Sequence, residues 1–292
     1  MLQRNHKGLQ DFGYQFSTDG ILTDCNSGAS FDLRNLLANK ENSQEYYEEF
    51  ADAINQHVYQ LLQEKCGLEK IFIPVNATVD EPRSFFFASP SFRDSAKLLI
   101  LINGSGVRAG QWSRKLIINQ GLGKGSMLPY ITQAQLQGFS VLVMNSNENR
   151  VLDNSGQIRS VRSSRTPEAH AEYIWKEFIE GSTVMSIAIV AHSAGGNTTI
   201  RLADSIGEDF CQRVFAVAFT DAAYIPGREK GWEHLKKVAQ NWKLSHKPLG
   251  TVLSANGGAL KQVAAGTMIH DEIPHMALKS IFNYINDCYG IG

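Results

Sequence analysis

The sequence predicts an α/β protein with a mostly parallel central sheet covered by helices on both faces. Continuous apolar runs such as Lys97–Ile102 and Ser186–Val190 are typical of strands buried on both faces of a sheet. These runs alternate with amphipathic stretches of helical period, one of which starts at Thr166-Pro167 with proline at its first helical position. Alternating strands and helices indicate parallel strands joined by crossover helices.

The other elements are expected in order along the chain. A hairpin is expected over Gly13–Thr23 with its turn at Asp19-Gly20, followed by an amphipathic helix over Ser43–Lys65. The expected strands are Ile71–Val75, Ser84–Ala88, Lys97–Ile102, Ser140–Met144, Ser186–Val190, Phe215–Thr220 and Gly250–Ser254. The further expected helices are Ser126–Gln137, Thr166–Phe178, a stretch ending near Ile206, Gly231–Gln240 and Pro274–Asp287.

We expect a single domain over residues 1–292, with an N-terminal extension over 1–70 and a variable polar loop over 145–165. The composition, 43% hydrophobic and 20% charged residues, is that of a globular protein and excludes extensive disorder. The formal net charge of −1 gives no global basic field, so we expect no direct binding of nucleic acid.

The compartment is inferred from three absences in the sequence. No apolar run reaches the length of about 18 residues that a membrane span needs. The first ten residues lack a secretory apolar core, and the four cysteines show no disulfide or zinc spacing. We therefore expect no membrane association and a cytoplasmic or nuclear location.

The segment Ala191–Gly195 reads Ala-His-Ser-Ala-Gly and joins an expected strand to an expected helix. In a nucleophile elbow a serine sits on a strained strand-to-helix turn, and the residues two before and two after it must be small. Ala191 and Gly195 meet this requirement around Ser193. We predict that Ser193 is the nucleophile of an α/β-hydrolase fold, and that His192 supports the turn. The alternative is a glycine-rich turn with an incidental serine.

Acyl transfer also needs two N–H donors that face the developing oxyanion. In this fold the donors come from the residue after the nucleophile and from the loop after an earlier strand. Ala194 follows Ser193, and Gly104 and Ser105 follow the strand Lys97–Ile102. We therefore predict an oxyanion hole at Ala194, Ser105 and Gly104. A simple turn or a phosphate-binding loop is the alternative, although the sequence contains no P-loop motif.

The acid of a catalytic triad is expected at Asp221. It directly follows the strand Phe215–Thr220, which is the next expected strand after the elbow, and it precedes the candidate histidines in the order serine, acid, histidine. A carboxylate there would orient the base and stabilise its protonated form. The alternative is an aspartate that caps a helix or forms a turn.

The base is expected at His270, just before the last helix, where its ring can reach the carboxyl edge of the sheet. His275 is the rival, but Pro274 opens the helix and would leave His275 in its first turn. We expect a hydrogen bond between the Ser193 hydroxyl and the His270 ring, looser when no substrate is bound.

Other cofactor chemistry is not indicated. No G-x-G-x-x-G opens the first βα unit and no H-E-x-x-H is present. Glu272 with His270 and His275 does not make a good set of metal ligands. We expect neither a cofactor nor a metal.

Over nearly its whole length the chain resembles the Arb-type (argonaute-binding protein) domain family, including its animal cotranscriptional regulator homologues. The resemblance is carried by Gly13–Phe16, Phe72–Thr78, Glu81–Phe85, Leu101–Gly106, Arg108–Trp112, Leu116–Asn119, Asn147–Asn149, Ala191–Gly196, Thr220-Asp221, Gly266-Thr267, His270 and Ser280–Phe282. It departs at Asn103, where animal members have histidine, at Ala194, where they have an aromatic residue, and over Val151–Arg165, where they carry a long charged insert.

The resemblance implies an α/β-hydrolase fold in which Ser193, Asp221 and His270 match the nucleophile, acid and base. It also implies a role in RNA silencing, chromatin or splicing through argonaute binding. The three matched side chains favour a serine hydrolase acting on an ester, thioester or similar acyl bond of a small substrate. The association with argonaute favours the alternative, a scaffold that keeps the fold and binds protein partners.

Overall fold

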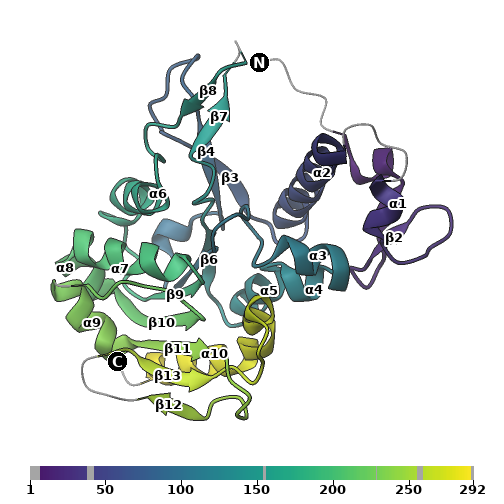
Figure 1. Cartoon of the computed structure of the whole chain (residues 1–292). Coiled ribbons are helices and arrows are strands. Elements are labelled where there is room, and N and C mark those ends of the chain that lie inside the picture. Colours follow the sequence, from purple (N-terminus) through teal and green to yellow (C-terminus); the bar gives the residue numbers. More distant parts are fainter. Residues whose placement is uncertain (1–6, 38–42, 154–155, 228, 255–258, 291–292) are drawn as a thin grey trace.

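A mixed nine-stranded sheet forms the centre of the computed structural model, which describes residues 7–37, 43–153, 156–227, 229–254 and 259–290 (Figure 1). From edge to edge its strands are β12 (Val252–Ser254), β13 (Lys261–Ala264), β11 (Ala239–Lys243), β10 (Val214–Thr220), β9 (Ile187–His192), β5 (Leu98–Ile102), β6 (Ser140–Val143), β4 (Ser84–Ala88) and β3 (Glu69–Ile73). The strands from β13 to β6 pair in parallel, whereas β12, β4 and β3 make antiparallel pairs at the two ends. The predicted mostly parallel sheet is confirmed.

Each face of the sheet packs against its own layer of helices. Successive residues of β5 alternate between two apolar clusters, since Leu99 and Leu101 belong to one and Ile100 to the other. The first face is covered by α2 (Ser43–Glu64), α3 (Arg114–Gln120), α5 (Leu128–Leu136) and α10 (Ile273–Gly290), and the second by α6 (Pro167–Ile174), α7 (Gly195–Ile206), α8 (Glu208–Arg213) and α9 (Lys230–Val238). In Figure 1 the two layers lie on opposite sides of the strands.

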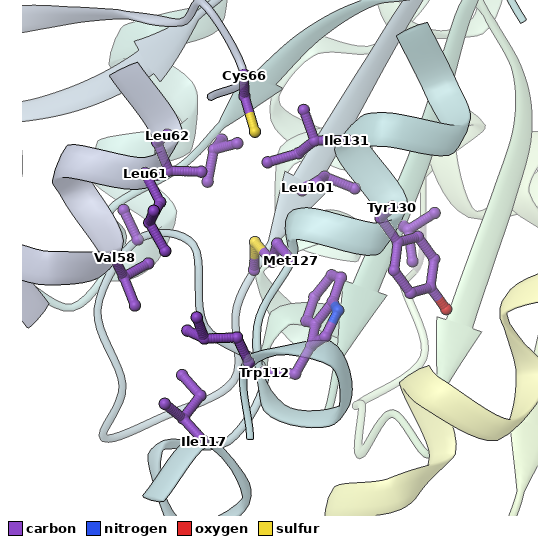
Figure 2. Packing of buried hydrophobic residues seen from close by; sticks show 14 of the residues in the cluster. Val58, Leu61, Leu62, Cys66, Leu101, Trp112, Ile117, Met127, Tyr130 and Ile131 are labelled. Carbon is purple, nitrogen blue, oxygen red and sulfur yellow. The ribbon is translucent and has the colours of Figure 1, made fainter. Parts of the chain in front are cut away.

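The N-terminal residues pack on the first of these faces. The predicted hairpin forms from β1 (Tyr14–Phe16) and β2 (Leu22–Asp24), and it is followed by α1 (Leu33–Leu37) and the long helix α2. Figure 2 shows Val58 and Leu62 of α2 facing Met127 and Ile131, with Leu101 of the sheet behind them. The N-terminal segment therefore shares one apolar cluster with the central sheet.

The motif Arg108–Trp112 explains how α2 is held against the sheet layer. Gly110 has a φ of +80°, and a Cβ atom placed there would lie 2.8 Å from a methyl of Val58 and 2.9 Å from one of Leu62. The Gln111 amide donates a hydrogen bond of 2.7 Å to the buried Asn55 side chain. A side chain at this position would force Val58 or Leu62 to shift and would strain the left-handed backbone, so glycine is favoured.

The segment 145–165, expected as a variable polar loop, contains a separate two-stranded hairpin of β7 (Arg150–Leu152) and β8 (Ile158–Ser160). Each strand has three residues, most of them exposed, so no apolar alternation reveals them in the sequence. Local hydrogen bonds close the turn, since Asp153 N–H donates to Gln157 O at 2.9 Å.

The C-terminal edge of the sheet also differs from the expectation. The helix expected over Gly231–Gln240 ends at Val238, and the chain continues as the central parallel strand β11, which was not predicted. Polar residues in β11, among them Asn241, are buried between two neighbouring strands, so the sequence of the strand does not look apolar. The elements β13, α3, α4 (Leu122–Gly125) and α8 were likewise not predicted.

Among the described residues, none of the helices combines the length and the apolar character that a membrane crossing requires.

Candidate active site

Ser193 stands in a tight turn between β9 and α7, with a φ of +52°. Among the described residues, the other non-glycine residues with positive φ are Ser91 and Asp221. The glycines after the turn are needed for space. A Cβ on Gly195 would lie 2.9 Å from the Ile102 carbonyl oxygen, and one on Gly196 would lie 2.3 Å from the Ala222 Cβ. Backbone strain at a single residue, kept in place by close packing, is typical of functional turns.

The loop after β5 lies directly beside this serine. A Cβ placed on Gly104 would be 3.1 Å from the Ser193 Cβ, so the backbone passes as close as glycine permits. Within the described part of the chain, the backbone N–H groups of Ser105 and Ala194 donate no hydrogen bond. Two free N–H donors therefore lie near the serine. One is in the loop after β5 and the other in the turn after Ser193, as the sequence predicted.

Two asparagine side chains hold the loop after β5. The Asn147 amide donates to the carbonyl oxygens of Gly104 at 2.7 Å and of Val107 at 2.8 Å. Asn103 donates to the same two oxygens at 3.3 and 3.0 Å. In a trans peptide the N–H points opposite to the preceding C=O. Because the Gly104 carbonyl is held toward the asparagines, the Ser105 N–H is turned away from them.

Asp221 occupies the corresponding strained position at the end of β10, with a φ of +47°. Its backbone N–H donates to the Trp242 carbonyl at 2.8 Å, which ties it to the neighbouring strand β11. The Asn241 side chain forms two hydrogen bonds with Ala222, the residue after Asp221. It accepts from the Ala222 N–H and donates to the Ala222 carbonyl, both at 3.3 Å. The unpredicted strand β11 thus fixes the direction of this carboxylate.

His270 begins the 3₁₀ turn His270–Glu272, and its Nδ1 is 2.6 Å from the Asp221 Oδ2. The preceding Gly266-Thr267 helps to fix the backbone that leads to His270, because the Thr267 hydroxyl accepts from the Ile269 N–H at 3.1 Å. Just beyond, the buried Tyr130 hydroxyl donates to the Pro274 carbonyl at 2.6 Å and anchors the start of α10. The rival His275 is exposed and does not border the site.

Lys243, on β11, is a site residue that the sequence did not reveal. Its ammonium group forms an ion pair with the Asp221 Oδ1, on the opposite side of the carboxylate from His270. Burial by itself would raise the pKa of Asp221, but the hydrogen bonds from His270 and Lys243 outweigh it and lower the pKa to about 2. No motif marks Lys243, because its strand was not recognised.

The pKa values of the two histidines of the site, His192 and His270, are shifted in opposite directions. The hydrogen bond to Asp221 raises the pKa of His270 above its usual value, although burial and Lys243 oppose the rise. Burial, together with the nearby His270, lowers the pKa of His192 to about 4, so this ring is neutral at pH 7. The His192 Nδ1 lies 2.9 Å from the Thr220 carbonyl oxygen, which accepts from it in the neutral ring. This contact agrees with the expected supporting role of His192.

The expected hydrogen bond between Ser193 and His270 is not formed in the described structure. The ring of His192 instead packs against that of His270, with centroids 4.6 Å apart. Both Ser193 and His270 line one pocket, so the two groups face the same space. Catalytic hydrogen bonds in unliganded enzymes are often long and tighten only around a substrate.

The pocket has a volume of about 370 Å³ and opens to solvent. Its described lining consists of Tyr47, Gly104–Val107, Trp112–Lys115, His192, Ser193, His270 and Asp271. Figure 2 shows Trp112 beside Met127 and Tyr130. Trp112 thus connects the lining of the pocket to the apolar cluster on the first face of the sheet. A volume of this size accommodates a small ligand.

The same region is the one place in the described chain with a possible set of metal ligands. His192, His270 and Asp271 each have one ligand atom within 4.8 Å of the others. The Nδ1 atoms of both rings already contact oxygen atoms, which leaves the Nε2 atoms. A metal bound to the His270 Nε2 would leave that nitrogen unable to accept a proton, so metal binding and proton acceptance at this ring exclude each other.

Comparison with known proteins identifies the family. The model of the Arb2 domain matches residues 6–249, a span that contains Ser193 and Asp221 and ends before His270. A cotranscriptional regulator ARB2A homolog from Xenopus tropicalis is 32% identical, over 96% of this chain and 79% of its own length. A FAM172 family protein homolog from Caenorhabditis elegans is 36% identical, over 95% of this chain and 86% of its own length.

Among solved structures, a "predicted CIB-like hydrolase" from Thermoplasma acidophilum aligns at 15% identity with a TM-score of 0.42, over 75% of this chain and 98% of its own. The parallel sheet and the strained serine between strand and helix are features of this chain itself. With these features the chain has an α/β-hydrolase fold, and it belongs to the Arb2 domain family.

Proposed function

We propose that this protein is a serine hydrolase that cleaves an ester, thioester or similar acyl bond of a small substrate. One observation carries the proposal. A serine at a φ of +52° shares a pocket with a histidine whose other nitrogen is 2.6 Å from a buried carboxylate. A nucleophile, a base and a group that orients the base are the parts that acyl transfer needs.

In the proposed reaction the Ser193 Oγ attacks the acyl carbon while the His270 Nε2 accepts the hydroxyl proton. Asp221 holds the Nδ1 proton and stabilises the charged ring. The Ser105 and Ala194 N–H groups, with the Gly104 backbone close by, bind the oxyanion. His270 returns the proton to the leaving group, and a water molecule activated by the same ring then cleaves the acyl-enzyme. The reaction requires no cofactor.

Covalent labelling tests the proposal directly. A fluorophosphonate probe is expected to label the purified protein at one site, and Ser193→Ala is expected to abolish the labelling. Ser91→Ala is the matched control, because Ser91 also has a positive φ, 54°, but lies outside the pocket. Labelling and ester hydrolysis should survive a strong chelator. Labelling that persists in Ser193→Ala, or activity that disappears on metal removal, would contradict the proposal.

A non-catalytic scaffold is the second candidate, favoured by the missing hydrogen bond between Ser193 and His270 in the described structure. The curated relatives from Xenopus tropicalis and Homo sapiens are named cotranscriptional regulators. From the resemblance to the argonaute-binding family we propose a cytoplasmic or nuclear location, with argonaute, chromatin or splicing proteins as partners. Affinity capture with wild type and Ser193→Ala separates the two functions. A scaffold requires the same partners in both variants and no probe labelling in either.

A further inference from the structure

We infer that the pocket beside Ser193 selects acyl substrates that carry a negatively charged group, a carboxylate or a phosphate, and that Arg114 binds this group. The inference rests on the proposed hydrolase function and specifies its substrate class. The lining of the pocket, the partners of its charged residues and its size support it.

Arg114 stands out among the arginines of the described chain. Three of them are not fully exposed, namely Arg108, Arg114 and Arg213. Arg213 is paired with Asp209 at 2.6 Å and with two backbone carbonyls, and Arg108 donates to the Asn147 carbonyl at 3.1 Å. Arg114 makes no hydrogen bond or ion pair with any described residue. A half-buried guanidinium without a partner among the described residues is suited to bind an anion from solution.

The surroundings of Arg114 add positive charge to the pocket. Lys115, the next residue, also lines the pocket and has no ion-pair partner in the described chain. Asp271 is the acidic residue of the described lining, and its Oδ2 accepts from the Ser113 hydroxyl at 3.0 Å without pairing with Arg114. Asp221 does not balance these charges, because it is already engaged by His270 and Lys243.

The rest of the lining argues against a long apolar acyl chain. Its large apolar or aromatic members in the described chain are Tyr47, Val107 and Trp112, and the remainder is mostly polar or glycine. With a volume of about 370 Å³, the pocket suits a short acyl group with the anionic group a few bonds from the reacting carbon. The planar guanidinium of Arg114 could bind either anion through two hydrogen bonds.

Paired substrates test the inference. 4-Nitrophenyl glutarate has a free carboxylate, whereas its methyl ester has the same chain without the charge. Wild type is expected to prefer the anionic substrate by about tenfold or more in kcat/KM. Arg114→Gln should lower that preference by about tenfold, because only one of the substrates loses an ionic partner. Arg201→Gln should leave it unchanged, since Arg201 is exposed, has no ion-pair partner among the described residues and borders a different pocket.

Direct binding keeps the inference testable if neither ester is cleaved. Glutarate and inorganic phosphate are titrated into Ser193→Ala by calorimetry, with and without Arg114→Gln. Saturable binding that depends on Arg114 supports the inference and shows which anion is preferred, even if hydrolysis fails. Equal rates on both esters, or binding that Arg114→Gln does not weaken, overturns the inference and leaves the proposed hydrolase intact.

Discussion

At the scale of single residues, the site depends on one carboxylate shared between a histidine and a lysine. Asp221 accepts from His270 with one oxygen and pairs with Lys243 through the other. The aspartate favours the protonated form of His270, and the lysine opposes it. The pKa of the proposed base is therefore set by a residue on a neighbouring strand as well as by its hydrogen-bond partner.

Replacing Lys243 is expected to move the pH dependence of activity. A general base must be neutral to accept a proton, so kcat/KM should rise as pH increases through the pKa of His270, which lies above 6.5. Lys243→Met removes a positive charge that lowers this pKa, and the rise should move to higher pH. Lys247→Met, an exposed lysine after the same strand, is the control and should show no shift. Identical profiles for wild type and Lys243→Met would refute the role of Lys243.

Asn147 is expected to act as a positioning residue for the oxyanion hole. Asn147→Ala removes the 2.7 Å hydrogen bond to the Gly104 carbonyl and leaves the longer 3.3 Å bond from Asn103, so the Ser105 N–H is held less firmly in one direction. We expect kcat to fall by about tenfold or more with little change in KM, because the interaction matters mainly in the transition state. Asn26→Ala, in the N-terminal loop, should change neither constant. A rise in KM with kcat unchanged would indicate a role in substrate binding instead.

At the scale of secondary-structure elements, close backbone approaches decide which glycines are essential. Gly110 and Gly181 both have positive φ, +80° and +75°, but only Gly110 has atoms of a packed helix within 3 Å of the missing Cβ. Gly181→Ala should therefore cost about 1 kcal/mol from backbone strain alone. Gly110→Ala should cost about 1–3 kcal/mol more, because it also pushes α2 from the loop.

Denaturant unfolding of the two alanine variants measures this difference in the free energy of unfolding. A smaller loss for Gly110→Ala than for Gly181→Ala would mean that α2 moves freely and is not held by the motif Arg108–Trp112.

At the scale of the whole molecule, two buried histidines are expected to link stability to pH. Burial lowers the pKa of His170 to about 3 and, together with His270, that of His192 to about 4. Unfolding returns both rings to a pKa near 6.5, so below pH 6.5 the unfolded chain binds more protons than the folded one. Stability should therefore fall as pH decreases from 6.5 toward 4, by about 1.4 kcal/mol per pH unit for each ring.

Chemical denaturation between pH 4 and 7.5 tests this expectation. His170→Gln removes one of the two rings and should flatten the decline, whereas replacing the exposed His275 should not. A stability that stays constant from pH 6.5 to 4.5 would mean that the buried rings take up protons without unfolding. His270 acts in the opposite sense, since its raised pKa contributes stability that is lost as pH rises through that pKa.

The sequence alone determined those features that depend on local pattern. Apolar runs reveal β5, β9 and β10, because strands buried on both faces need apolar residues throughout. Small residues around Ser193 mark the elbow, because a larger side chain would collide at the turn.

Tertiary structure decided what depends on residues far apart in the chain. It brought Lys243 to Asp221 through β11, whose buried polar side chains hide the strand from pattern analysis. It also placed Arg114 in the lining of the same pocket as the serine and left the Ser193 hydroxyl without a hydrogen bond to His270 in the described structure, since helix packing and loop anchoring set those positions.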